Sequence, residues 1–163
     1  MQIHEDVDAF FMAKAIKEAQ KAANKGEVPI GAVMVRDQEV ICAAHNLRES
    51  GQDPLAHAEM IVLRRASKQL KSWRLEATTL YVTLEPCLMC MGAIIQARVP
   101  RLVFAAFDPK AGACGTLYDL SNDSRLNHRV RVTSRVMEHE ATSLLKGFFK
   151  ALRKEKRLAR KGL

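Results

Sequence analysis

Two short stretches, His57-Ala58-Glu59 and Pro86-Cys87-Leu88-Met89-Cys90, constrain this chain more than any other part of its sequence. Together they supply one imidazole and two thiols, and zinc takes nitrogen and sulfur ligands in a tetrahedral shell. A structural zinc site closes that shell with a fourth protein ligand, whereas a catalytic site leaves the fourth position to water. The nearest other candidate group is the carboxylate of Glu59. Three ligands beside an acid indicate a catalytic zinc held by His57, Cys87 and Cys90.

The spacing within each stretch predicts where the metal lies relative to two helices. Residues two apart do not share a helix face, so His57 and Glu59 can approach one metal only from beyond the end of a helix. Asp53-Pro54 predicts that this helix begins there, because Asp is a good N-cap and proline suits the first helical position. Pro86 predicts a second helix start, with both cysteines in its first turn. Two helix N-termini directed at one ion lower the pKa values of the cysteine thiols.

The pattern H-x-E followed by P-C-x-x-C is the signature of the zinc deaminases that act on nucleobases. Further runs resemble the bacterial tRNA-specific adenosine deaminases of the cytidine/deoxycytidylate deaminase superfamily. These runs are VPIGAV (28–33), TLYVTLEPC (79–87), DPKAG (108–112) and NHRV (127–130). The resemblance covers nearly the whole chain and implies a five-stranded cytidine-deaminase-like fold, one zinc ion per subunit, a homodimer and a tRNA anticodon stem-loop as partner. It also implies substrate contacts by Asn46, Ala58, Asp108 and Phe149.

The mechanism that this resemblance implies is hydrolytic deamination of adenosine to inosine at the wobble position of the anticodon loop. Zinc lowers the pKa of a bound water, and Glu59 takes the water proton and passes it to N1 of adenine. Glu59 then protonates the departing amine. Asn46 suits adenine because its amide both donates and accepts, although asparagine is also a common turn residue. Asp108 either accepts a hydrogen bond from a ribose 2′-OH or caps a turn before Pro109.

Two other functions share parts of this pattern. A guanine or cytosine deaminase that acts on free nucleobases has the same metal motif in a different pocket. The basic tail and the runs at 108–115 and 127–130 count against it. A non-catalytic, zinc-stabilised RNA-binding protein needs a fourth protein ligand, which Cys114 offers, and makes Glu59 incidental.

The length of 163 residues predicts a single domain over residues 1–163, which the resemblance implies is a zinc-dependent deaminase domain. Hydrophobic residues make up 48% and charged residues 27% of the chain, as is usual for a soluble globular protein. No apolar stretch approaches the ~20 residues of a membrane span, and the acidic start of the chain lacks a signal-peptide pattern. Cys42 and Cys114 have no reason to pair in a reducing compartment. We therefore expect a cytoplasmic protein.

The net charge of +8 is concentrated at the C-terminal end. From Lys146 onward, eight basic residues accompany a single acid, Glu155. This basic helix or tail, about 146–163, is either a solvated segment that keeps the protein soluble or an arm that attracts RNA phosphates. We favour the arm.

Hydrophobic periodicity predicts an α/β fold, namely a three-layer α/β/α sandwich around a mixed sheet. Helices are expected from about Asp8 to Lys25, from Pro54, from Cys87 and from Thr142 to Arg157. The expected strands are Ile30–Val35, Val40–His45, Thr79–Leu84, Arg101–Ala106 and Val130–Thr133, of which the first two form a hairpin.

The helix that follows Cys87 is apolar on every face, and such a helix must be buried all round. A C-terminal helix packed over it would bury its outer side within one subunit. We expect a subunit interface there instead, in agreement with the homodimer that the resemblance implies.

Overall fold

The computed structural model describes residues 2–162, with side chains from residue 6 onward. Within that range, no helix is both long and apolar enough to cross a bilayer. The elements are α1 (Gln2–Asn24), β1 (Gly31–Arg36), β2 (Glu39–His45), α2 (Arg48–Gly51), α3 (Ala58–Leu70), β3 (Thr78–Leu84), α4 (Leu88–Gln96), β4 (Arg101–Ala106), β5 (Arg131–Thr133) and α5 (Glu138–Arg160).

The five strands form one mixed sheet in the order β2-β1-β3-β4-β5. β1 is antiparallel to both β2 and β3, whereas β3, β4 and β5 run parallel. Asp37 and Gln38 connect β1 to β2, and their positive φ angles, 51° and 61°, suit the two-residue turn of a hairpin. Parallel neighbours need a crossover, which α4 supplies between β3 and β4. The predicted hairpin and mixed sheet are confirmed.

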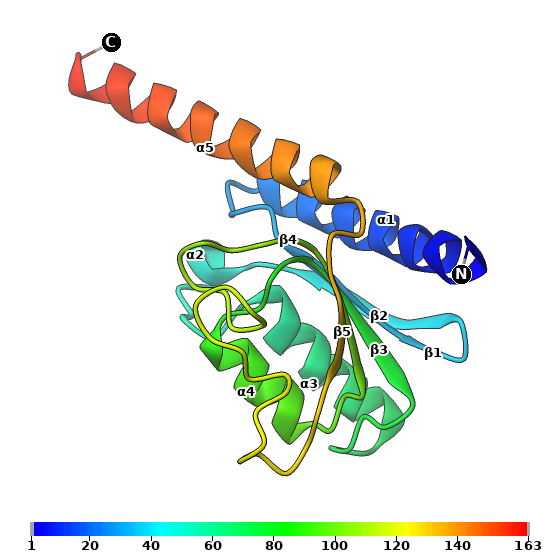
Figure 1. Cartoon of the computed structure of the whole chain (residues 1–163). Coiled ribbons are helices and arrows are strands. Elements are labelled where there is room, and N and C mark those ends of the chain that lie inside the picture. The colour runs from blue at the N-terminus through cyan, green and yellow to red at the C-terminus, as the bar shows by residue number, and fades with distance from the viewer. Residues whose placement is uncertain (1, 163) are drawn as a thin grey trace.

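Helices cover both faces of the sheet: α1 and α5 lie on one face, and α3 and α4 lie on the other (Figure 1). Alternate residues of β3 point into the two cores, because side chains along a strand alternate between faces. Leu80 and Val82 pack with α3 and α4, and Tyr81 packs with α1. Gly31 allows α1 to approach β1 closely, since an added Cβ would lie 2.0 Å from the carbonyl oxygen of Ala15. The predicted α/β/α sandwich is therefore confirmed.

Helix boundaries differ from the sequence predictions at α1, α3 and α5, and the difference at α3 bears on the site. Helix α3 begins at Ala58 and not at Pro54, and its N-cap is His57. Asp53 does not cap a helix, because its Oδ1 accepts the N–H of Leu55 (2.9 Å) in a local turn. The short helix α2 occupies part of a segment without predicted structure. α1 begins at Gln2, before the predicted Asp8, and ends at Asn24, whereas α5 extends beyond its predicted limits at both ends.

The carboxyl ends of β2, β3 and β4 lie at one edge of the sheet, since these strands point the same way. β2 leads into Asn46, β3 leads into Glu85 and Pro86, and β4 leads into Phe107 and Asp108. The N–H of Glu85 donates to the carbonyl of Ala106 (2.8 Å), which joins two of these exits. Sites in open α/β sheets commonly lie outside such carboxyl ends.

Candidate metal centre and active site

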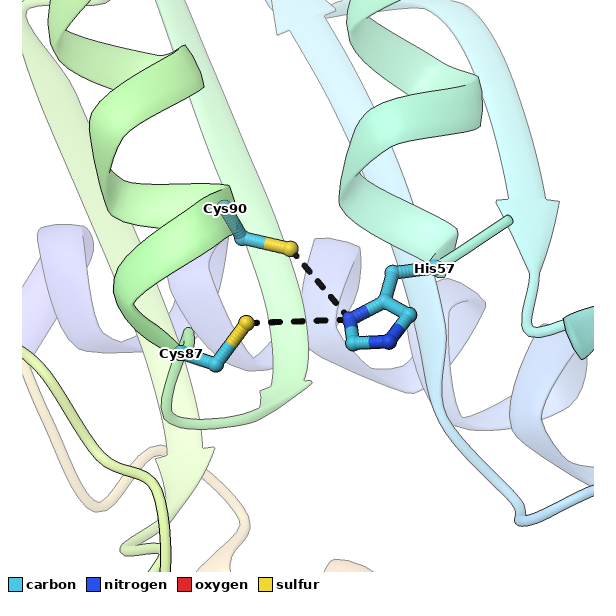
Figure 2. A group of neighbouring side chains, drawn as sticks. All are labelled: His57, Cys87 and Cys90. Atoms are coloured by element: carbon cyan, nitrogen blue, oxygen red, sulfur yellow. Dashed lines mark hydrogen bonds between the residues drawn. The ribbon is translucent and has the colours of Figure 1, made fainter. Parts of the chain in front are cut away.

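Two helices begin beside each other at this edge, and each begins with a predicted metal ligand. His57 is the N-cap of α3, with φ −73° and ψ 149°, and Cys87 is the N-cap of α4, with φ −76° and ψ 176°. Cys90 follows in the first turn of α4. Figure 2 shows the imidazole and the two thiols facing one another between the two helix starts. The first N–H groups of both helices have no partner within the helix and bring partial positive charge to this point.

The distances among the three donors fit a tetrahedral zinc ion. Nδ1 of His57 lies 3.7 Å from Sγ of Cys87 and 3.5 Å from Sγ of Cys90. With Zn–N near 2.0–2.1 Å and Zn–S near 2.3 Å, tetrahedral geometry separates nitrogen and sulfur ligands by about 3.6 Å. Among the residues that the structure describes, this metal-ligand group contains His57, Cys87 and Cys90 and no fourth member. Cys114, the fourth ligand that a structural zinc would need, is outside it.

The three donors also form a linked acid–base set. Hydrogen bonds from Cys90 and His57 outweigh burial and lower the pKa of Cys87 to about 4. The same hydrogen bond from His57 to Cys87 raises the pKa of the imidazole, and hydrogen bonding to Cys87 together with burial raises that of Cys90. A thiolate is therefore favoured at Cys87, and the thiolate is the form of cysteine that binds metals.

Glu59 lies in the first turn of α3, directly beside these donors but outside their group. Its side chain is buried, with 4% exposure, and burial raises its pKa to about 7. The nearby Cys87 thiolate acts in the same direction, while His57 opposes it. A carboxyl group with a pKa near neutrality can both accept and release a proton at physiological pH, as general acid–base catalysis requires.

Comparisons with known proteins agree with this geometry. The model of the MafB19-like deaminase family matches residues 5–153. The tRNA-specific adenosine deaminase of Bacillus subtilis (strain 168) is 56% identical over 156 residues, which cover 96% of this chain and 97% of the relative. The chain belongs to the tRNA-specific adenosine deaminase family.

Solved structures extend this similarity to three dimensions. One comes from a study of A-to-I editing by tRNA:A34 deaminases at the wobble position of transfer RNA. It has a TM-score of 0.81 and 42% identity, and the match covers 83% of this chain and 99% of that chain. A guanine deaminase from Nitrosomonas europaea has a TM-score of 0.70 and 24% identity, with 84% and 81% of the two chains covered. That second likeness shows a shared fold.

Asn46, a base-reading residue by resemblance to the adenosine deaminase family, is buried at the same sheet edge. Its Oδ1 accepts the N–H of Arg48 (3.3 Å), and its Nδ2 donates to the carbonyl of Val28 (3.5 Å). The N–H of Leu47 donates to the carbonyl of Ala56 (3.0 Å), which holds this turn next to the first residue of the metal group. The contacts of a turn former are thus present, and base reading by Asn46 stays a prediction.

Asp108 forms the turn that its position before Pro109 predicts. Its Oδ1 accepts the N–H groups of Lys110 (2.9 Å) and Ala111 (3.2 Å). The N–H of Asp108 donates to Oε2 of Glu85 (3.0 Å). The turn alternative is therefore confirmed, and a ribose contact through the other oxygen, Oδ2, stays a prediction.

The last two predicted substrate residues lie in contrasting places. Ala58 is fully buried at the start of α3, between His57 and Glu59. Phe149 is 40% exposed on α5, on the opposite side of the sheet from α3 and α4, with its ring edge-on to Phe148. Beyond Leu152, the basic part of α5 is exposed and extends away from the sheet (Figure 1).

The apolar helix α4 is only partly covered by this subunit. Cys90, Met91, Ile94 and Ile95 are buried, whereas Leu88 is 46% exposed. The C-terminal helix does not cover the outer side of α4, because α5 packs on the other face of the sheet against α1, β3 and β4. Burial of α4 by α5 is therefore wrong as an alternative, and the homodimer stays a prediction.

Sequence reasoning missed one residue at this edge, Glu85. Its side chain is 2% exposed and accepts hydrogen bonds from the loop that follows β4. Its place at the end of an apolar strand, directly before Pro86, indicates a residue at the sheet edge but not its hydrogen-bond partners.

Proposed function

We propose that this protein hydrolyses adenosine to inosine at the wobble position of a tRNA anticodon loop, with zinc as its cofactor. The observation that carries the proposal is that three metal donors and a separate acidic side chain lie side by side at one edge of the sheet. His57, Cys87 and Cys90 have zinc-ligand spacing and leave a fourth position, and the buried Glu59 stands next to them without joining the group. The family relationship supports the choice of substrate.

The reaction consumes one water and releases ammonia as the C6 amino group of adenine is replaced by oxygen. Zinc held by the three donors would lower the pKa of a water, which supplies a nucleophile near neutral pH. Glu59 accepts a proton from that nucleophile and delivers it to N1 of adenine. It then takes the remaining proton of the oxygen that has added to C6 and delivers it to the departing amine, which leaves as ammonia. Its pKa of about 7 suits both directions of transfer.

The substrate must present an adenine outside a base stack, because the metal donors and Glu59 are buried or half-buried. An anticodon loop satisfies this need with little cost of unpairing. The exposed basic end of α5 supplies an attraction for RNA phosphates that depends on salt. A homodimer that covers Leu88 on α4 completes the proposal, and the cytoplasm is the compartment in which we place the protein.

The test is incubation of purified, zinc-loaded protein with total tRNA, followed by mapping of the positions where adenosine becomes inosine. Inosine at the wobble position, absent with Glu59→Gln, is the expected result. Ammonia release from free guanine or cytosine, without inosine in tRNA, would replace the proposal with a free-base deaminase. RNA binding without either reaction would leave a non-catalytic zinc protein.

A further inference from the structure

The carboxylate of Glu85 is surrounded by hydrogen-bond donors from a single loop. Its Oε1 accepts the N–H groups of Cys114 (3.0 Å) and Thr116 (3.1 Å). Its Oε2 accepts the N–H of Asp108 (3.0 Å) and the hydroxyl of Thr116. Among residues 6–162, no basic side chain forms an ion pair with this buried carboxylate. The loop therefore supplies the hydrogen bonds that its burial requires.

The loop, residues 108–116, is closed tightly around this carboxylate. At Gly112, an added Cβ would lie 2.2 Å from Oε2 of Glu85 and 2.7 Å from the carbonyl oxygen of Asp108. The N–H of Gly112 donates to that same carbonyl (3.0 Å). The N–H of Ala113 donates to the carbonyl of Pro86 (2.9 Å), one residue before the first cysteine ligand. The loop conformation is thus determined by the strand end that delivers α4.

The loop also borders the proposed reaction centre. Its Ala113 is hydrogen-bonded to Pro86, directly before the ligand Cys87. Ala113 and Cys114 belong to the same hydrophobic core as Ala58, which stands between His57 and Glu59 in the chain. Leu117 and Tyr118 follow directly and are more than half exposed, at 52% and 53%. Their N–H groups both donate to the carbonyl of Gly112, at 3.0 and 3.3 Å, so the exposed pair is carried by the part of the loop that Glu85 holds.

We propose that Glu85 is a positioning residue for substrate binding: its carboxylate holds loop 108–116 against the start of α4, and the loop in turn presents Asp108 and the exposed Leu117-Tyr118 pair to the RNA. This inference rests on the proposed function. Glu85 is not a catalytic residue, since its four hydrogen bonds all go to the loop. Because the loop contains neither a metal donor nor Glu59, its displacement should weaken binding more than the chemical step.

Glu85→Gln is the direct test, because the amide keeps the size of the carboxylate and replaces one acceptor oxygen by a donor. One pair of loop donors must then lose its partner. We expect KM for an anticodon stem-loop to rise by about tenfold, with kcat within about twofold of wild type and zinc content unchanged. Thr116→Val, which deletes only the hydroxyl contact, should raise KM in the same direction by a smaller factor, and Thr116→Ser should restore it.

Asp8→Asn is the matched control. It also neutralises a buried carboxylate, but on the opposite face of the sheet, and it should leave KM unchanged. Unchanged KM in Glu85→Gln, or a rise equal to that in Asp8→Asn, would overturn the inference. Loss of zinc together with kcat would also overturn it, since Glu85 would then support the metal centre. If Glu85→Gln does not fold, the KM values of Thr116→Val and Thr116→Ser test the inference instead. Absence of inosine formation by the wild type would refute the proposed function itself, independently of these variants.

Discussion

Arg101→Ala should lower the free energy of unfolding by about 3 kcal/mol, because it leaves a buried carboxylate without its cation. Nη1 and Nη2 of Arg101 donate to the two carboxylate oxygens of Asp8 at 2.8 and 2.6 Å. The hydroxyl of Tyr81 donates to the same group at 2.9 Å. This cluster joins α1 to β3 and β4 in the protein interior, where Asp8 is 5% exposed.

The magnitude follows from the two partners' surroundings. Breaking a buried pair by removing one partner costs ~3–5 kcal/mol. The lower end applies here, because the Arg101 side chain is 20% exposed and water can enter its place, and because Tyr81 keeps its bond. Against a total of ~5–15 kcal/mol for a natural domain, this loss is large.

Urea unfolding at neutral pH measures this effect as a lower midpoint with an unchanged slope. Arg36→Ala is the control, since Arg36 and Asp37 form an exposed pair at 3.7 Å, and exposed pairs contribute ~0–1 kcal/mol. Zinc content should be unchanged, because Asp8 lies on α1 and is hydrogen-bonded to Tyr81 of the core on that side. The metal donors lie between α3 and α4 on the other face. A loss no greater than that of the control would mean that the carboxylate is hydrated in the folded protein, and the reasoning would be refuted.

Three further changes test other parts of the molecule. Glu59→Gln should abolish inosine formation at unchanged zinc content by elemental analysis, and loss of zinc would make Glu59 a ligand. Glu27→Gln should lower the free energy of unfolding at pH 7 by ~1–3 kcal/mol. Burial opposes the charge of Glu27, but the N–H donors of Ser50 and Glu49 outweigh burial and lower the pKa of this carboxyl group. That stabilisation exists above the unfolded pKa and disappears as pH falls through the folded one, so the urea midpoints of wild type and variant should converge in acid; a constant gap would contradict this. Asp108→Asn keeps Oδ1 for the turn and alters only Oδ2, so it should reduce the preference for RNA over DNA hairpins, measured as kcat/KM, by roughly tenfold; equal changes on both substrates would exclude a ribose contact.

Much of the fold follows from the sequence because its strongest signals are periodic. The strands are short, apolar and bounded by turn residues, and β4 begins and ends where predicted. The layer order follows from alternating strands and helices, a pattern that parallel sheets require. Helix ends were less well predicted, since Asp53-Pro54 satisfies the preferences for a helix start and nevertheless forms a local turn through Leu55. A local preference of about 1 kcal/mol does not decide a boundary when tertiary contacts favour another.

The candidate site was predictable to the extent that its chemistry resides in side chains. His57, Cys87, Cys90 and Glu59 carry groups suited to their proposed roles at that spacing. The structure brings the three donors together and places Glu59 in the first turn of the same helix that His57 caps. The role of Glu85 had no such signature. Its partners are mainly backbone N–H groups of residues 108–116, and because nearly every residue has such a group, no pattern of residue types records the contact.

The wrong prediction of where α3 begins and the arrangement of the metal donors have one physical cause. Helices prefer Ser, Thr, Asp or Asn at the N-cap, and α3 and α4 instead have His57 and Cys87 there, neither of which makes a side-chain cap hydrogen bond. Replacing a good cap by a poor one costs a helix ~0.5–2 kcal/mol. Both helices are therefore less stable than they would be with Ser, Thr, Asp or Asn at the N-cap. The extended backbone of an N-cap directs a side chain past the helix end, and the uncapped N–H groups remain free to favour anions at the same point. That environment favours the Cys87 thiolate, whose pKa is lowered to about 4, and an aspartate cap would neutralise it. Residues that break a local rule at two facing helix starts are therefore the expected mark of a functional centre.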